Sequence, residues 1–268
     1  ISLGGYMGSQ ILADAVDAAG KLGIILVAAA GNDAINLPVY PAAYPGVIGV
    51  GASDAANYLA GFSNFGDSID VLAPGDGVMV SSRNTTVIKR SGTSYSTAYV
   101  SGIISLLLSE NENLSFAQIS EILENTSNYA SMNHQPSGVG AGVINAERAL
   151  MYMKGITRND LAITDIYPVR RALENNVNSS VFVRVENRGS APASGSVSVS
   201  FENHTTHDIT IPALPAGGRQ EFTITANGGA SVDGKHSAFA TLLGSDDLPE
   251  SNQYAAFMPI VDVIGNDV

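Results

Sequence analysis

The chain reads Ile24-Ile25-Leu26-Val27-Ala28-Ala29-Ala30 near its start, and the residues Gly31-Asn32-Asp33 follow directly. An apolar run without polar alternation is typical of a strand that is buried on both faces, as in a parallel sheet. Glycine, asparagine and aspartate then favour a turn where the run ends. This stretch therefore predicts a parallel β-sheet with helices on both of its faces.

Residues 1–157 repeat this alternation of strand and helix. Helical spacing of apolar residues predicts helices over Ile11–Leu22, over Ser115–Leu123 with Ser115 as N-cap, and over Asn145–Met153. Further apolar runs predict short strands at Ile1–Leu3, Val47–Val50, Ile69–Leu72 and Val78–Ser81. We therefore expect a doubly wound α/β domain over residues 1–157, with its functional residues at the carboxyl ends of the strands.

Residues 158–258 have a different pattern. No convincing helix is present there, and apolar and polar residues alternate in about seven short segments separated by turn signals such as Asn187-Arg188-Gly189. This spacing is typical of an all-β sandwich of the immunoglobulin-like type. The clearest segments are residues 161–166, 181–185, 197–201, 209–211, 222–224 and 237–243. The tail, residues 259–268, is an edge strand, a linker or a segment that pairs with another chain.

Composition and charge exclude several classes of protein. The 268 residues carry a net charge of −12, which argues against a nucleic-acid partner. No apolar run approaches the roughly 20 residues of a membrane-spanning helix. The chain has no cysteine, so disulfides and thiolate metal sites are excluded. We expect a globular protein with no nucleic-acid partner, no membrane span and no certain cofactor.

A second stretch carries the candidate chemistry. It reads Ser91-Gly92-Thr93-Ser94-Tyr95-Ser96, and an apolar helical run follows it up to Ser109. A serine in the first turn of a buried helix lies beside unpaired N–H groups and the positive end of the helix dipole, which favour negative charge next to its hydroxyl. A Ser/Thr-rich N-cap on a core helix explains the same residues without chemistry. The stretch alone leaves both interpretations open.

Four motifs, in this order, resemble the C-terminal half of a subtilisin-like serine peptidase, a subtilase. They are Ser2-Leu3-Gly4-Gly5, Ala28-Ala29-Ala30-Gly31-Asn32, the run from Tyr40 to Ala52, and Ser91-Gly92-Thr93-Ser94. One Gly-Thr-Ser triplet would mean little, whereas the ordered set spans most of the first 155 residues. The resemblance implies the α/β fold of that family and hydrolysis of a peptide or protein substrate.

The resemblance also implies a role for each matching position. Ser94 aligns with the nucleophile, and its backbone N–H and the Asn32 side chain align with the donors of the oxyanion hole. The expected lining of the primary specificity pocket is Ser2, Leu3, Gly4, Ala29, Ala30 and Gly31, with Val39 and Ala42 where the pocket ends. The pocket should therefore be apolar and shallow. From the residues alone, Asn32 is a turn residue at the end of a strand.

A serine nucleophile needs a base, and the base needs an orienting carboxylate. In subtilases both precede the Ser-Leu-Gly-Gly segment, which here opens the sequence. The first half contains one histidine, His134, in a polar loop outside every family motif. We expect the Asp and the His to come from a segment before Ile1. A sheet without its first strands has an open edge, which that segment or neighbouring copies would cover.

The serine motif also departs from the family pattern. Subtilases usually continue after the serine with Met-Ala-Thr/Ser-Pro-His, whereas this chain has Tyr95-Ser96-Thr97-Ala98-Tyr99. A larger ring then lies near the nucleophile, and the Pro-His pair at the helix start is missing. The sequence therefore leaves two functions open. One is a secreted serine endopeptidase, and the other is an inactive extracellular structural or adhesive protein that self-assembles through exposed strands.

The second half resembles the CARDB-type (cell-adhesion-related) β-sandwich, a module of extracellular proteins. The matching segments are Asp160–Ile163, Val183–Gly189, Ile211–Gly218 and Asp246–Asn252. The acidic residues of the last segment either bind Ca²⁺ through oxygen ligands or form a solvated loop, and the loop is favoured. His204, His207 and His236 are expected at the surface, outside any metal site. Asn-x-Ser/Thr sites allow glycosylation at Asn84, Asn113, Asn125, Asn178 and Asn203.

Overall fold

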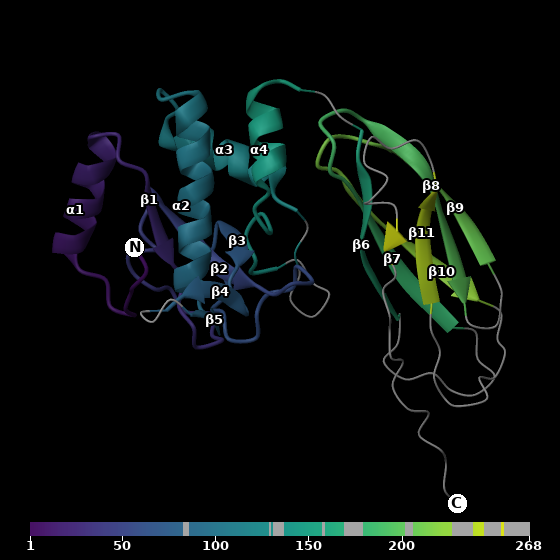
Figure 1. Cartoon of the computed structure of the whole chain (residues 1–268), viewed down its shortest axis with the longest axis horizontal. Helices are drawn as coiled ribbons and strands as arrows, with labels where there is room; N and C mark the ends of the chain where they lie inside the picture. The colour runs from purple at the N-terminus through teal and green to yellow at the C-terminus, as the bar shows by residue number, and fades with distance from the viewer. Residues whose placement is uncertain are drawn as a thin grey trace, which may run out of the picture. The chain divides into compact units, whose positions relative to one another are not determined.

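The chain divides into two compact units, Ile1–Gly155 and Ile156–Val268 (Figure 1). The structure is a computed structural model. It describes residues 1–82, 86–128, 130, 137–156, 159–168, 179–201, 206–226, 238–243 and 253–254. Each unit is described by itself below.

A parallel sheet of three strands lies at the centre of the first unit. The strands β1 (Leu26–Ala29), β2 (Val47–Ser53) and β3 (Val71–Pro74) pair in the order β1-β2-β3. Every residue of β2 is buried, as expected for a strand with neighbours on both edges and helices on its faces. The apolar runs therefore predicted the sheet correctly, although β1 and β3 each begin two residues later than expected.

The described part of this unit contains four helices: α1 (Gln10–Lys21), α2 (Thr93–Glu110), α3 (Phe116–Thr126) and α4 (Ala146–Met153). The three helices predicted from apolar spacing are confirmed within a few residues. Ser115 caps α3 in a capping box with Gln118, which satisfies two N–H groups that the helix itself leaves unpaired. Asn145 caps α4 by accepting the N–H of Arg148.

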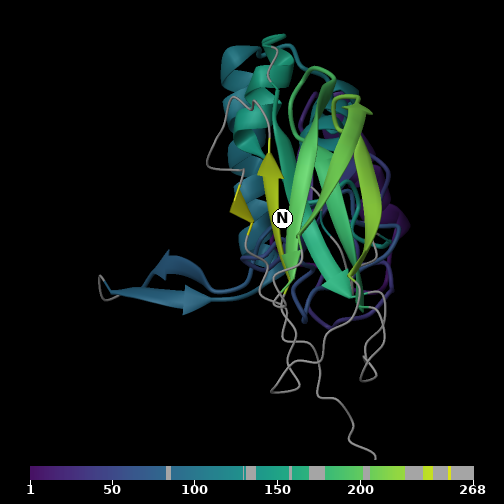
Figure 2. The same ribbon diagram turned by 90° about the vertical axis from the view of Figure 1, so that its right-hand side faces the viewer.

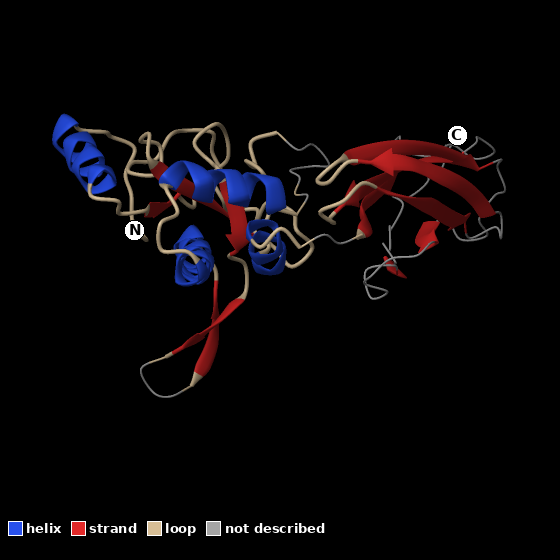
Figure 3. Cartoon of the chain, turned by 90° about the horizontal axis from the view of Figure 1, so that it is seen from above, coloured by secondary structure: helices blue, strands red, loops and turns tan. Residues whose placement is uncertain are grey.

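The helices pack on opposite faces of the sheet because neighbouring side chains of a strand alternate in direction. Val27 belongs to a core cluster with residues of α2 and α3, including Val100, Ile104 and Ile119. The next residue, Ala28, packs with Val16 of α1 on the other side. Figure 3 shows the helices around the sheet from above. This is the doubly wound arrangement that the sequence predicts.

Two expected strands differ from the structure. Residues 78–81 form β4 (Val78–Ser81), which is not a buried strand of the parallel sheet but pairs antiparallel with β5 (Val87–Arg90). The resulting hairpin projects from the unit (Figure 2), and Met79 is 59% exposed. Residues 1–3 form no strand either. Only Ile1 hydrogen-bonds to β1, donating its amine to Val27 O and accepting the N–H of Ala29.

The residues of the second unit that the structure describes form two antiparallel sheets. The first has the order β10-β7-β6, and the second has the order β12-β11-β8-β9. The six predicted strand segments are confirmed, and most of the strands are longer than expected. Their bounds are β6 Leu161–Pro168, β7 Ser179–Asn187, β8 Ala193–Phe201, β9 Thr206–Leu214, β10 Arg219–Ala226, β11 Ala238–Leu243 and β12 Gln253–Tyr254. Apolar residues of both sheets, such as Val183 and Val199, share one core.

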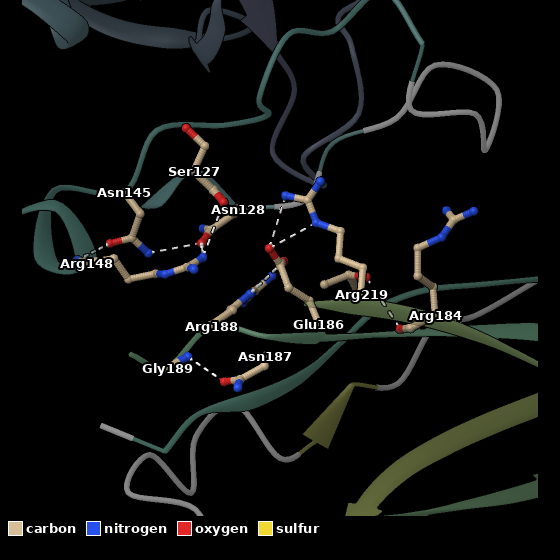
Figure 4. A network of polar contacts seen from close by, with 11 residues as sticks. Ser127, Asn128, Asn145, Arg148, Arg184, Glu186, Asn187, Arg188, Gly189 and Arg219 are labelled. Carbon is tan, nitrogen blue, oxygen red and sulfur yellow. Dashed lines mark hydrogen bonds and ion pairs between the residues drawn. The ribbon is translucent and has the colours of Figure 1, made fainter. Parts of the chain in front are cut away.

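Ion pairs with at least one buried partner join the three strands of one sheet. Arg184 of β7 contacts Asp165 of β6 at 3.4 Å and Glu221 of β10 at 2.7 Å. Glu186 is fully buried, and Arg219 donates to it from Nε and Nη2, each at 3.2 Å (Figure 4). Each of these pairs links residues that lie opposite one another in the strand register. A slip of the register by one residue would separate the charges and leave them buried, so the pairs specify the alignment.

Several predicted features lie outside the described residues. They are the acidic stretch 246–252, the tail 259–268, His134, His204, His236 and the glycosylation sites at Asn84, Asn178 and Asn203. Among the helices in the described part of the chain, none is both long and apolar enough to cross a membrane.

Candidate active site

Ser94 lies in the first turn of α2, as its sequence predicts. The chain reaches this helix from the β4–β5 hairpin, whose base is closed by the hydrogen bond from Gly92 N to Gly75 O at 2.8 Å. Ser96 Oγ donates to Ala73 O at 3.0 Å, and this bond joins the same turn to β3. The first N–H groups of a helix have no acceptor within the helix. Here the N–H of Tyr95 donates to Gly92 O at 3.1 Å, whereas the N–H of Ser94 has no acceptor among the described residues and is available to an anion or a polarised carbonyl.

The Asn32 side chain is fixed by the start of α2. Its Oδ1 accepts the backbone N–H of Thr93 at 2.8 Å and the Thr93 hydroxyl at 3.0 Å. Since the oxygen is held twice, the amide NH₂ is the end left for a ligand, and its nitrogen lies 3.9 Å from where a Cβ on Gly92 would be. The structure therefore brings Asn32 and Ser94 to the same helix start, although they are distant in sequence.

The Ser94 hydroxyl contacts the beginning of the chain. Ser94 Oγ donates to Ser2 O at 3.2 Å, and Ser2 Oγ donates to Ser94 O at 3.1 Å. The part of the first unit that the structure describes contains no histidine, because His134 lies outside it. The geometry therefore assigns no base to Ser94 among the described residues.

The two predicted substrate-binding segments lie on either side of Val39. A Cβ on Gly4 would lie 2.5 Å from Val39 Cγ1, and a Cβ on Gly31 would lie 3.1 Å from Val39 Cγ2. The isopropyl group of Val39 thus occupies the space between the two glycines, and it is only 4% exposed. The other predicted lining residues differ in exposure: Ala29, Ala30 and Ala42 are buried, whereas Ser2 and Leu3 are exposed.

Asn64 organises the loop after β1, a role that the sequence analysis did not assign. It is 1% exposed, and its Oδ1 accepts the N–H groups of Asp33 at 2.9 Å and Ile35 at 3.3 Å. Its Nδ2 donates to Ala30 O at 3.0 Å and to the Tyr6 hydroxyl at 3.4 Å. The Tyr6 hydroxyl in turn donates to the Asp33 carboxylate, which raises the pKa of Tyr6. The sequence held one indication of this role: Asn64 belongs to the segment Phe62-Ser63-Asn64-Phe65-Gly66, which also resembles a subtilase motif.

No group of three or more acidic, histidine or cysteine side chains with metal-binding geometry occurs among the described residues. His207, the one histidine they include, lies half-buried on β9, with its ring 5.9 Å from the Phe201 ring. The expectation that His207 is a surface residue is therefore only partly correct. The candidate Ca²⁺ site at residues 246–252 lies outside the described residues.

The sequence matches known proteins along its first unit. Residues 1–142 match the model of the Subtilase family. A subtilisin from Bacillus pumilus is 38% identical over 153 residues, which cover 56% of this chain and 54% of that protein. Subtilisin BL from Lederbergia lenta is 36% identical over 149 residues, with 56% and 54% coverage. The chain thus spans about half the length of these curated relatives.

Solved structures agree with these matches. The self-cleaved protease domain of PatA superposes with a TM-score of 0.52 at 30% identity and covers 58% of this chain and 61% of that one. The prenylagaramide maturation protease PagA superposes with a TM-score of 0.51 at 28% identity, with 56% and 58% coverage. The first unit therefore has a subtilisin-like α/β fold. The chain belongs to the subtilase family, and this unit is part of a subtilisin-family serine protease domain.

Gly31 provides a stability test of the site. It has a φ of +102°, and an added Cβ would collide with Asn64 and press on Val39. We expect Gly31→Ala to lower the free energy of unfolding by about 2 kcal/mol or more, because left-handed backbone strain and overpacking add. Urea unfolding of the full-length protein, followed by circular dichroism, measures the change.

Gly5→Ala is the matched control. Nothing lies within 4 Å of a Cβ at Gly5, and its φ is not positive, so this variant should unfold within about 0.5 kcal/mol of the wild type. Equal midpoints for Gly31→Ala and Gly5→Ala would contradict the crowding that the structure shows around Gly31.

Proposed function

We propose that the first unit is the serine-bearing half of a secreted serine endopeptidase. Ser94 Oγ attacks the carbonyl carbon of a peptide bond, the C–N bond breaks, and the amine leaves with a proton. Water then hydrolyses the ester on Ser94 and releases the acid. The histidine that accepts and returns the proton, and the aspartate that orients it, come from residues of the protein outside these 268.

The observation that carries the proposal is the double hydrogen bond from Thr93 to Asn32. It presents the Asn32 amide and the Ser94 backbone N–H at one helix start, where a tetrahedral intermediate on Ser94 would place its oxyanion. Such donors stabilise the developing charge because they are oriented before the reaction begins. A Ser/Thr-rich N-cap needs no such asparagine.

The substrate would bind as an extended peptide beside Ser2–Gly4 and Ala29–Gly31. The space between these segments is the proposed pocket for the residue before the scissile bond. Val39 occupies part of that space, and buried Ala42 lies where the pocket ends. We infer a shallow apolar pocket that accepts small residues.

The second part of the proposal concerns residues 158–258. We propose a CARDB-like, immunoglobulin-like β-sandwich that is a spacer or adhesion module, with 1–157 as the peptidase part and 259–268 as a strand-like tail or linker. Two antiparallel sheets around one core support the sandwich. CARDB-type modules occur in extracellular proteins, and subtilisins as a class are secreted, so both resemblances favour a secreted protein. Ca²⁺ is a candidate ligand of residues 246–252 only.

A second function is favoured by a specific observation. Met7 is 90% exposed, Ile11 84% and Leu22 80%, so α1 and its flanks present an apolar surface. In the peptidase, residues before Ile1 would cover this surface. In an inactive structural or adhesive protein, neighbouring copies would cover it.

Replacement of the nucleophile separates the two functions. Ser94→Ala in the full-length protein should abolish peptide hydrolysis and covalent labelling by a serine-directed phosphonate, because the ester on Ser94 cannot form. Hydrolysis is measured with a fluorogenic peptide and labelling by mass spectrometry of the intact protein.

Ser105→Ala is the control, since Ser105 is exposed on the same helix and bonds only the preceding turn. It should keep both activities. Turnover that persists in Ser94→Ala would refute the assignment of Ser94. A wild-type protein that neither turns over nor is labelled, and that forms ordered polymers, would support the structural function.

The oxyanion donor is tested separately. Asn32→Ala should lower kcat about 10²- to 10³-fold with little change in KM, which is the range known for loss of this donor in a subtilisin. Asn113→Ala, an exposed asparagine in the loop after α2, should leave both constants unchanged in bacterially expressed protein. A large rise in KM at constant kcat would instead show that Asn32 only binds substrate.

The pocket is tested by removing the Val39 side chain. Val39→Gly should raise kcat/KM for peptides with Leu or Phe before the scissile bond by about tenfold or more relative to Ala, because apolar space opens beside Gly4 and Gly31. Steady-state kinetics with three peptides that differ only at that residue measure the ratio. Leu37→Gly, in the same loop and 51% exposed, should keep the wild-type order of preference.

A further inference from the structure

A hydrogen bond between side chains connects the two segments that border the proposed specificity pocket. We call these segments, Ser2–Gly4 and Ala29–Gly31, the two walls. Two residues beyond the glycine that ends each wall, the chain carries Tyr6 on one side and Asp33 on the other. The Tyr6 hydroxyl donates to the Asp33 carboxylate, so the continuations of the two walls are joined directly. We call this hydrogen bond the bridge.

Asn64 holds the bridge against the second wall. The side chain of Asn64 is buried, accepts the backbone N–H of Asp33 at 2.9 Å and donates to Ala30 O at 3.0 Å. The same amide nitrogen donates to the Tyr6 hydroxyl at 3.4 Å. One buried side chain therefore contacts a residue of the wall and both ends of the bridge, which places the bridge next to this wall.

The first wall is held by backbone hydrogen bonds. Gly5 donates its N–H to Tyr40 O at 3.0 Å and accepts the N–H of Tyr40 at 2.8 Å. Tyr40 directly follows Val39, the residue whose side chain packs against the glycine of each wall. The valine thus fills part of the space between the walls, whereas the bridge ties together the segments on either side of that space.

The bridge persists in neutral and mildly alkaline solution. A hydroxyl that donates to a carboxylate makes a stronger hydrogen bond than two neutral groups make. Hydrogen bonding to Asp33 also raises the pKa of Tyr6, because ionisation would replace the donor with a second negative charge. Tyr6 therefore keeps the proton that forms the bridge. Both side chains are exposed, so the contribution of the bridge is modest.

We propose that the hydrogen bond from Tyr6 to Asp33 limits how far the two walls can separate, and thereby selects substrates with a small side chain before the scissile bond. The inference rests on the proposed peptidase function and adds two positioning residues to its pocket. A large side chain between the walls would have to stretch or break the bridge, and this cost would lower its turnover. A side chain as small as that of Ala would leave the bridge intact.

The test removes the bridge and keeps the aromatic ring. Three peptides differ only in the residue before the scissile bond, which is Ala, Leu or Phe. In full-length Tyr6→Phe, kcat/KM for the Leu and Phe peptides should rise about three- to tenfold relative to the Ala peptide, because a hydrogen bond of this strength no longer opposes their entry. A general loss of stability would lower the three rates together and leave their ratios unchanged.

Variants of Asp33 separate the bridge from the effect of charge. Asp33→Asn removes the charge and keeps an oxygen that accepts the Tyr6 hydroxyl, so the wild-type ratios should remain. Asp33→Ala removes the acceptor and should shift the ratios as Tyr6→Phe does. Equal shifts in Asp33→Asn and Asp33→Ala would assign the preference to charge and overturn the inference.

Tyr152→Phe is the matched control. It also removes a tyrosine hydroxyl that donates to an exposed carboxylate, that of Glu121 at 3.3 Å, but this bond joins α4 to α3. The variant should keep the wild-type ratios. Hydrolysis with the same ratios in wild type and Tyr6→Phe would overturn the inference and leave the peptidase function standing. If the wild type shows neither hydrolysis nor labelling of Ser94, the peptidase function fails and the inference fails with it.

Discussion

The two hydrogen bonds from Thr93 to Asn32 hold the first unit's site together. They connect the end of β1 to the start of α2, two points 61 residues apart in the chain. The same Thr93 hydroxyl accepts the N–H of Gly31 at 3.3 Å, so one side chain fixes the turn after the strand and the first turn of the helix. Because the asparagine oxygen is saturated, the direction of its NH₂ is a property of the fold and not of a bound ligand.

The two units are specified in different ways. In the first unit, close packing positions the backbone. Gly4 and Gly31 have no side chains, and the side chains of Val39 and Asn64 pack directly against their backbone. In the second, buried charges align the strands, and burial together with the Glu221 carboxylate raises the pKa of the neighbouring Tyr167 hydroxyl. Removing one charge of such a network leaves its partner buried and unpaired, which is more harmful than replacing both.

The sequence predicted the elements whose signal is local. An unbroken apolar run indicates a buried parallel strand, and Ser115 ahead of apolar residues at helical spacing indicates a capped helix. β5 was missed because Val87-Ile88-Lys89-Arg90 has no alternation that distinguishes it from a loop. Asn32 and Ser94 were recognised by resemblance, and the structure brings them together, although their catalytic roles stay predictions. The contact of Asn64 with Tyr6 spans 58 residues, and no local pattern encodes it.

The reciprocal hydrogen bonds between Ser2 and Ser94 fix the orientation of the Ser94 hydroxyl in the absence of a ligand. With its proton donated to Ser2 O, the Ser94 hydroxyl is held in one rotamer, and a peptide backbone that pairs with this first segment would compete for the same carbonyl. Each such neutral bond contributes about 0.5–1.5 kcal/mol, so a ligand can release the hydroxyl at little cost. The Ser94 hydroxyl therefore points towards the protein's own backbone until a bound peptide takes over the hydrogen bond to Ser2 O.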